Sequence, residues 1–239
     1  MDHRTRGFWI YLSITVVLSN GPALQRGYGS SSGLNNIPTA DTAPNLTLVF
    51  QGYSLFGDQR LPDHFAAFKF GLDPWESRKW RNRFEWGLDS RVAPGDAGPS
   101  VIQAKWATQP GPKWPAISIG VANVGSTREE RLRAGALFSF IVLSQDLKVF
   151  RLHGGYALQA GHNNTPILGL DKTFRVFHRE FILHTDALET DHRQNWAASF
   201  GGLYSVSTYF AVESWITQPI HGHPPSFIAK VDFIIPVKR

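Results

Sequence analysis

Ionisable side chains fall on the polar face of segments in which apolar and polar residues alternate. Five of them are Lys or Arg, six are Asp or Glu, and two are His. A set of one sign would predict selection of oppositely charged solutes, whereas this near-balance predicts ion pairs that bridge an interior. We expect these side chains to line a lumen and regard them as possible solute-binding residues: Lys69, Arg83, Glu85, Asp89, Lys105, Arg151, His153, Glu180, His184, Asp186, Glu213, Lys230 and Asp232.

Two smaller groups suggest other chemistry. His184 and Asp186 share a face with Glu180, so the trio could supply a base and an orienting acid, or simply form a hydrogen-bond network. His221-Gly222-His223 has a spacing that can chelate a metal, but it lies among prolines without an evident third ligand. No phosphate-binding glycine loop, dinucleotide fingerprint or zinc-protease helix is present. We expect no cofactor and no metal, and we assign no catalytic residue.

The elements that must position these residues have the period of β-strands. In Phe227–Ile235, large apolar residues occupy every second position, and His64–Leu72 and Arg81–Asp89 repeat the pattern. Successive Cβ atoms of a strand point to opposite faces, so this spacing predicts strands. We expect twelve, near residues 46–53, 64–72, 80–90, 100–108, 115–123, 136–144, 147–158, 165–170, 176–187, 195–204, 207–217 and 226–236.

Length and composition indicate one domain. The chain has 239 residues, a net charge of +5 and no cysteine. Its Lys and Arg residues form no cluster, so nucleic-acid binding is not expected. Without cysteine, neither disulfides nor thiolate metal sites can stabilise it.

The N-terminus resembles an export signal. His3, Arg4 and Arg6 precede the apolar run Phe8–Leu18, and Gly21-Pro22-Ala23 follows. This order predicts a cleaved signal peptide over residues 1–23. The alternative, a membrane anchor, would need about 20 apolar residues. Residues 24–44 are rich in Gly, Ser, Asn and Pro, and we expect a flexible periplasmic lead-in before a barrel over residues 45–239.

A soluble β-sandwich or barrel would show the same alternation with its apolar face turned inward. The connections favour a membrane barrel, because long polar stretches such as Arg91–Pro99 and Val124–Gly135 alternate with short links such as Gln145-Asp146 and Ser205-Val206. Aromatic residues also lie near strand ends, as interfacial girdles require: Tyr53, Trp80, Trp106, Trp114, Tyr156, Trp196, Tyr204 and Trp215.

Several segments resemble the YjbH-like exopolysaccharide-associated family of outer-membrane barrels. They are residues 32–40, Val101–Trp106, Pro115–Asn123 and Arg151–Tyr156. The resemblance implies an outer-membrane barrel and a link to surface polysaccharide. The end of the chain departs from the aromatic terminal residue common in such barrels, and Phe233 is the nearest candidate.

These observations predict an all-β fold, a transmembrane up-and-down antiparallel β-barrel of about twelve strands in the outer membrane of a Gram-negative-type bacterium. We expect a monomer that acts as a narrow porin-like pore or a structural cell-envelope component. Its expected partners are outer-membrane lipid, the barrel-insertion machinery and polysaccharide-export components. The alternatives are an outer-membrane enzyme that modifies or hydrolyses lipid, and a secreted soluble β-barrel binding protein.

Overall fold

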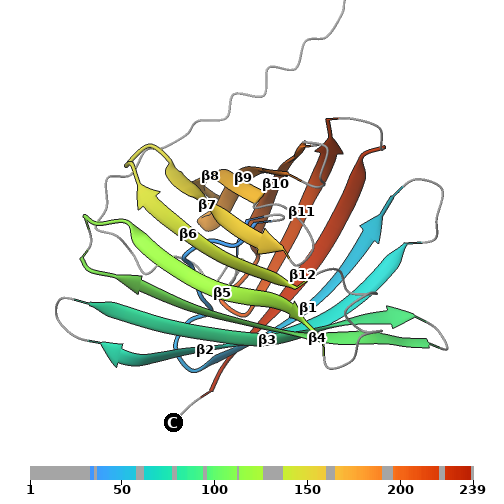
Figure 1. The fold of residues 1–239 in the computed structure, drawn as a ribbon, viewed down its shortest axis with the longest axis horizontal. Helices are drawn as coiled ribbons and strands as arrows, with labels where there is room; N and C mark the ends of the chain where they lie inside the picture. The colour runs from blue at the N-terminus through green and yellow to red at the C-terminus, as the bar shows by residue number, and fades with distance from the viewer. Residues whose placement is uncertain are drawn as a thin grey trace, which may run out of the picture.

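The computed structural model describes residues 33–34, 37–57, 62–76, 80–93, 96–111, 113–125, 137–159, 165–189, 196–220 and 224–237. They form a closed antiparallel barrel in which each strand pairs with its neighbours in the chain (Figure 1). The first and last strands close the ring, from Thr47 opposite Pro236 to Phe56 opposite Phe227. Closure leaves no unpaired edge, and the predicted up-and-down barrel of twelve strands is confirmed.

The strands are β1 (Thr47–Phe56), β2 (Asp63–Glu76), β3 (Arg81–Ala93), β4 (Asp96–Gln109), β5 (Ala116–Val124), β6 (Phe138–Asp146), β7 (Arg151–Gln159), β8 (Thr165–Val176), β9 (Arg179–Glu189), β10 (Trp196–Ser205), β11 (Phe210–Pro219) and β12 (Ser226–Pro236). No helix among the described residues is long and apolar enough to cross a membrane.

The two faces of the wall differ sharply in polarity. On β12, Phe233 and Ile235 are 51% and 48% exposed on the outside, whereas Lys230 and Asp232 are buried on the inside. The same division follows the other strands, with exposed side chains such as Ile141 on the outer face. Apolar outside and polar inside is the pattern of a transmembrane barrel, because lipid surrounds the wall and polar groups find partners within it.

Two sequence-based details are corrected. The expected long loop Arg91–Pro99 is mostly strand, because β3 continues to Ala93 and β4 begins at Asp96. A register shift between Ser90 and Val92 accommodates this extended hairpin. Among the expected girdle aromatics, Trp215 is only 7% exposed and lies on the inner face, and Tyr53, two residues after the buried Gln51, lies on the inner face as well.

The described part of the expected lead-in also departs from the prediction, because it lies inside the barrel. We call residues 33–46 the plug segment, of which 33–34 and 37–46 are described. It passes within the ring of strands, shown in blue in Figure 1, before turning into β1. Leu46 has a φ of 51° at this turn, and its N–H donates to the Gly71 carbonyl at 2.8 Å. The expected signal peptide and residues 24–32 lie outside the described residues.

Candidate functional site: a segment held inside the barrel

Glycines in the wall leave room for the plug segment. A Cβ atom on Gly71 would lie 2.1 Å from the Ala43 carbonyl oxygen and 2.3 Å from that of Pro44. On the other side of the lumen, a Cβ on Gly169 would lie 2.5 Å from the Leu34 Cδ1. Only a residue without a side chain allows such close approach of two chain segments.

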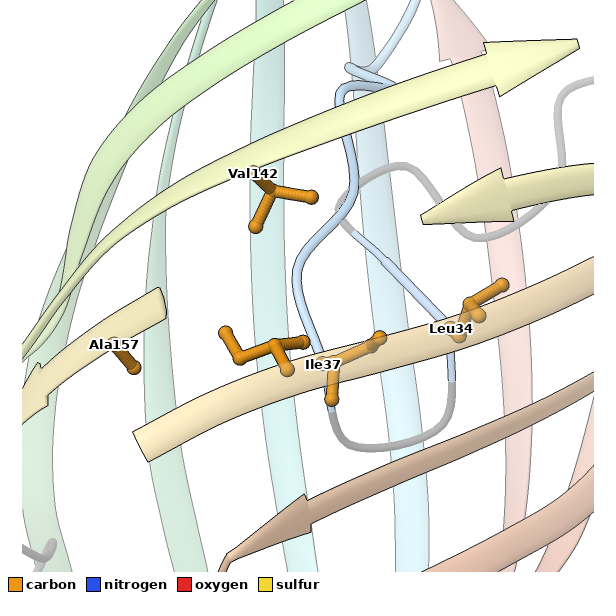
Figure 2. Close-up of a cluster of buried hydrophobic side chains, with 5 residues drawn as sticks. Leu34, Ile37, Val142 and Ala157 are labelled. Carbon is orange, nitrogen blue, oxygen red and sulfur yellow. The ribbon is translucent and has the colours of Figure 1, made fainter. Parts of the chain in front are cut away.

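Apolar contacts hold the beginning of the plug segment. Leu34 and Ile37 pack against Val142 of β6, Ala157 of β7 and Ile167 of β8. Figure 2 shows the Leu34 and Ile37 side chains on the inner segment, facing the wall that carries Val142 and Ala157. A fully buried aliphatic side chain contributes roughly 1.5–3 kcal/mol, so this cluster favours docking of the segment.

A second apolar contact holds the other end of the plug segment. Ala43 is fully buried against Val49 of β1 and Ile234 of β12, close to where the barrel closes. The two apolar clusters thus fix the segment at both ends of its path along the lumen.

The backbone of the plug segment bonds to side chains of the wall between these ends. The Thr39 carbonyl accepts hydrogen bonds from the Lys105 Nζ and the Ser118 Oγ, both at 3.2 Å. This pairing removes a large part of the cost of burying an extended backbone away from water.

Two backbone N–H groups of the segment donate in the opposite direction. The Ala40 N–H donates to the Ser144 Oγ at 3.0 Å, and the Ala43 N–H donates to the Glu85 Oε2 at 2.5 Å. The wall thus supplies both donors and acceptors to the backbone of the segment.

A charged contact ties the middle of the segment to β7. The Arg151 guanidinium donates to both carboxylate oxygens of Asp41, at 2.6 and 2.5 Å. Such a two-pronged pair is among the stronger hydrogen-bonding arrangements in proteins. Desolvation would raise the pKa of the Asp41 carboxyl, but Arg151 outweighs it and holds that pKa below its ordinary range. Asp41 is therefore a carboxylate at neutral pH.

Arg151 is itself fixed by the neighbouring strand. Its Nε donates to the Asp171 Oδ2 at 2.8 Å, and the His153 Nε2 lies 2.9 Å from the same oxygen. The His153 Nδ1 in turn lies 2.7 Å from the Ser144 Oγ. Ser144, His153 and Asp171 have the residue types of a catalytic triad, but His153 is fully buried and Ser144 bonds to the plug segment. Here the chain of contacts orients the residue that binds Asp41.

The opposite side of the lumen contains a separate charge cluster. Lys230 pairs with Glu213, and its Nζ lies 3.9 Å from the Asp232 Oδ2 and 5.8 Å from the centre of the Trp215 ring. Asp232 also accepts a hydrogen bond from the Gln51 Nε2 at 2.8 Å. The members of this cluster on β11 and β12 lie on the inner faces of these strands.

Most of the predicted lumen residues belong to these two regions. Glu85, Lys105, Arg151 and His153 belong to the wall around the plug segment, whereas His184, Glu213, Lys230 and Asp232 gather on the other side. The remaining ones are placed as follows: Lys69 and Asp186 are buried, and Arg83, Asp89 and Glu180 are half-buried. Asp89 accepts a hydrogen bond from Gln103 at 3.0 Å. Binding of a solute by these residues stays a prediction.

The other groups proposed from sequence have different surroundings. The His184 Nε2 lies 3.4 Å from the Glu213 Oε1 of β11, so its charged neighbour comes from outside the suggested trio with Glu180 and Asp186. Among the described residues, no three His, Asp or Glu side chains are arranged to hold a metal ion. His221 and His223 lie outside the described residues.

Some residues of the contacts between the plug segment and the wall, among them Asp41, Ser144 and Asp171, were not predicted from the sequence. Asp41 lies in a stretch without a period, and Asp171 follows the predicted end of its strand at residue 170. Extending the alternation of Ile167 and Gly169 by one step would have placed Asp171 on the inner face. Nothing in the sequence pattern marks Ser144 as a partner of the segment.

No family model matches the chain, and no curated protein matches it in sequence. Solved structures do match its fold. One is titled "KdgM porin", with a TM-score of 0.52, 6% identity, and coverage of 77% of this chain and 98% of that one. Another is the Acinetobacter baumannii outer membrane protein Omp33, with a TM-score of 0.48, 8% identity, and coverage of 80% and 99%. At such identities the likeness to the first structure concerns the fold alone.

Proposed function

We propose that this protein is an outer-membrane barrel whose narrow pore is closed by its own plug segment. The observation that carries the proposal is the set of matched contacts along residues 34–43, from the apolar cluster around Ile37 to the Asp41–Arg151 pair. A barrel of this size encloses more space than one layer of side chains fills. In this chain the plug segment and the Lys230 cluster lie within that space.

The membrane placement rests on the apolar outer face. Exposed side chains such as Phe50, Trp86, Ile141, Leu168 and Phe200 would be costly to leave in water over so large an area. In a bilayer they contact hydrocarbon, and the closed hydrogen-bond ladder satisfies the backbone. An outer membrane is the natural location for a barrel of this kind.

The closed pore supports two roles within the same proposal. If the plug segment leaves the lumen, a polar channel lined by Arg151 and Lys105 opens, and the protein conducts solutes. If it stays docked throughout, the protein serves as a structural component of the envelope. The contacts of Asp41 are polar and partly hydrated, with 35% of its side chain exposed. Water can replace such contacts more readily than it can replace a continuous apolar core. The segment can therefore leave the lumen, and this favours the role of a pore over that of a structural component.

Planar-bilayer recordings test the proposal. The wild-type barrel should be silent or open rarely, and removal of residues 33–44 should produce a steady conductance. Equal conductance of the two proteins would contradict closure by the segment. Silence of both would leave only the structural role. Heat-modifiable mobility of protein extracted from outer membranes should accompany these recordings, because it reports barrel closure and location together.

The partners that we propose follow from the resemblance to the YjbH-like family. This resemblance supports a link to surface polysaccharide, and it supports a monomer inserted by the usual barrel-assembly machinery. Co-purification with polysaccharide-export components from crosslinked membranes would be the expected outcome. Recovery of the barrel without them would remove this part of the proposal while leaving the closed pore intact.

A further inference from the structure

Two polar side chains pair on the outer face of the barrel, away from the lumen. Ser54 of β1 and His64 of β2 stand directly opposite each other, and the Ser54 Oγ lies 2.8 Å from the His64 Nδ1. Side chains alternate along a strand, so Ser54 points to the same side as Phe50, which is 44% exposed, and away from the buried Gln51. We call Ser54 and His64 the outer dyad.

Aromatic pairs flank the outer dyad along the wall. Toward the C-terminal end of β1, the ring centres of Phe56 and Phe227 lie 5.9 Å apart. Toward the N-terminal end of β1, the ring centres of Phe50 and Phe68 lie 6.5 Å apart. Phe56 is two residues beyond Ser54, or about 7 Å at the rise of a strand. The outer dyad therefore lies within the apolar belt but close to its edge. An ionisable side chain at such a place is costly and points to a function.

A hollow of about 760 Å³ adjoins the outer dyad, which forms part of its lining. Most other lining residues share the dyad's outward face, and among them are Gly52, Val212, Ala229 and Val231. Tyr53, Phe65, Glu213 and Lys230 border the hollow from the lumen side of the same strands. Because these outward side chains are small and apolar, they leave a shallow apolar depression next to Ser54 and His64. On the proposed membrane placement, this depression faces lipid, so its occupant is an acyl chain.

We propose that the outer dyad is the nucleophile and base of an esterase that acts on acyl esters of membrane lipids. The belt edge is where lipid esters lie, between headgroup and hydrocarbon. A Ser hydroxyl is a weak nucleophile until a base accepts its proton, and the short contact with His64 supplies that base. This inference goes beyond the closed pore and rests only on its membrane placement. It also assigns the lipid-hydrolysing alternative to the outer wall and not to the trio of Glu180, His184 and Asp186 in the lumen.

The reaction proceeds in two balanced steps. The Ser54 Oγ attacks the ester carbonyl carbon while its proton passes to the His64 Nδ1, and the bond to the leaving alkoxide breaks as His64 returns the proton to it. An acyl-serine and a free alcohol result. Water then attacks the acyl carbon, His64 accepts one of its protons, and the proton returns to the Ser54 Oγ as the fatty acid leaves. No metal or redox cofactor enters either step.

Hydrolysis of p-nitrophenyl palmitate by the purified barrel in detergent micelles tests the proposal. Ser54→Ala should abolish turnover, and His64→Gln should reduce it by about 100-fold or more, the usual effect of losing a general base. The matched control is Ser90→Ala, because Ser90 pairs on the outer wall with Ser100 at 2.7 Å and without a histidine. This variant should retain wild-type activity. A fluorophosphonate probe should label the wild type at Ser54.

Absence of both hydrolysis and labelling in the wild type would overturn the proposal, as would activity that survives Ser54→Ala. Heat-modifiable mobility and membrane fractionation of the same preparations separate this failure from failure of the proposed function. A correctly inserted barrel without activity would remove the esterase alone. Recovery of the protein in the periplasmic fraction would remove the membrane placement on which both depend.

Discussion

Replacing Asp41 by Asn tests the strongest polar contact of the plug segment. Asn keeps the shape of the side chain but removes its charge, so one of the two hydrogen bonds from Arg151 is lost and the other weakens. A hydrogen bond to a charged group contributes about 1.5–3 kcal/mol. Since the Asp41 side chain is 35% exposed, solvent screening puts the loss near the lower end. A loss of about 1.4 kcal/mol raises the undocked population about tenfold.

Labelling of an introduced cysteine measures that population. The chain has no cysteine of its own, so Thr42→Cys supplies a unique thiol in the plug segment. Thr42 is 8% exposed, and its hydroxyl is buried without a hydrogen-bond partner, so the exchange for a thiol disturbs little. A maleimide reagent should modify Cys only when the segment leaves the lumen. Asp41→Asn in this background should accelerate labelling about tenfold.

A lumen carboxyl outside the Asp41–Arg151 contact provides the control. Glu180→Gln removes a carboxylate of β9 and should leave the labelling rate of the Thr42→Cys protein unchanged. The reasoning is refuted if Asp41→Asn labels no faster than its Thr42→Cys parent while both form heat-modifiable barrels. It is also refuted if Glu180→Gln accelerates labelling as much, because charge removal anywhere in the lumen would then suffice.

Further substitutions probe the other contacts of the segment by the same labelling assay. Gly71→Ala places a Cβ 2.1 Å from the Ala43 oxygen and should undock the segment at a cost of about 1–3 kcal/mol, whereas Gly154→Ala, whose nearest neighbour is 4.0 Å away, should have no effect. Ile37→Ala removes a side chain that is 2% exposed and should weaken docking by about 2–4 kcal/mol; an unchanged labelling rate would show that the apolar cluster does not hold the segment. Arg151→Lys keeps the charge but loses the two-pronged geometry, so it should label faster than the parent; a rate equal to the parent's would mean that charge alone binds Asp41.

The barrel could be predicted from sequence because one physical rule governs its wall. Lipid requires apolar side chains at every second position. The spacing of Phe227, Ala229, Val231 and Phe233 in β12 therefore predicts both a strand and the face of it that points outward. The same parity placed Lys230 on the buried inner face. The ends of the strands were less certain. The extension of β3 to Ala93 was not predicted, because the residues near the turn of this hairpin do not continue the apolar-polar alternation.

The plug segment escaped prediction for a different reason. Its docking depends on contacts that are distant in the chain, such as Ala40 with Ser144, separated by 104 positions, and Asp41 with Arg151, separated by 110. Local composition, rich in Gly, Ser, Asn and Pro, indicates a flexible coil when considered alone. What orders the segment is the surface offered by the assembled wall, including the space above Gly71.

The central claim is that residues 33–44 close the lumen, and single-channel recording of the protein with and without them tests it most directly. The account predicts that the wild type is silent or opens rarely, and that the deleted form conducts steadily after inserting as a heat-modifiable barrel. A wild type that conducts as well as the deleted form would contradict closure by the plug segment.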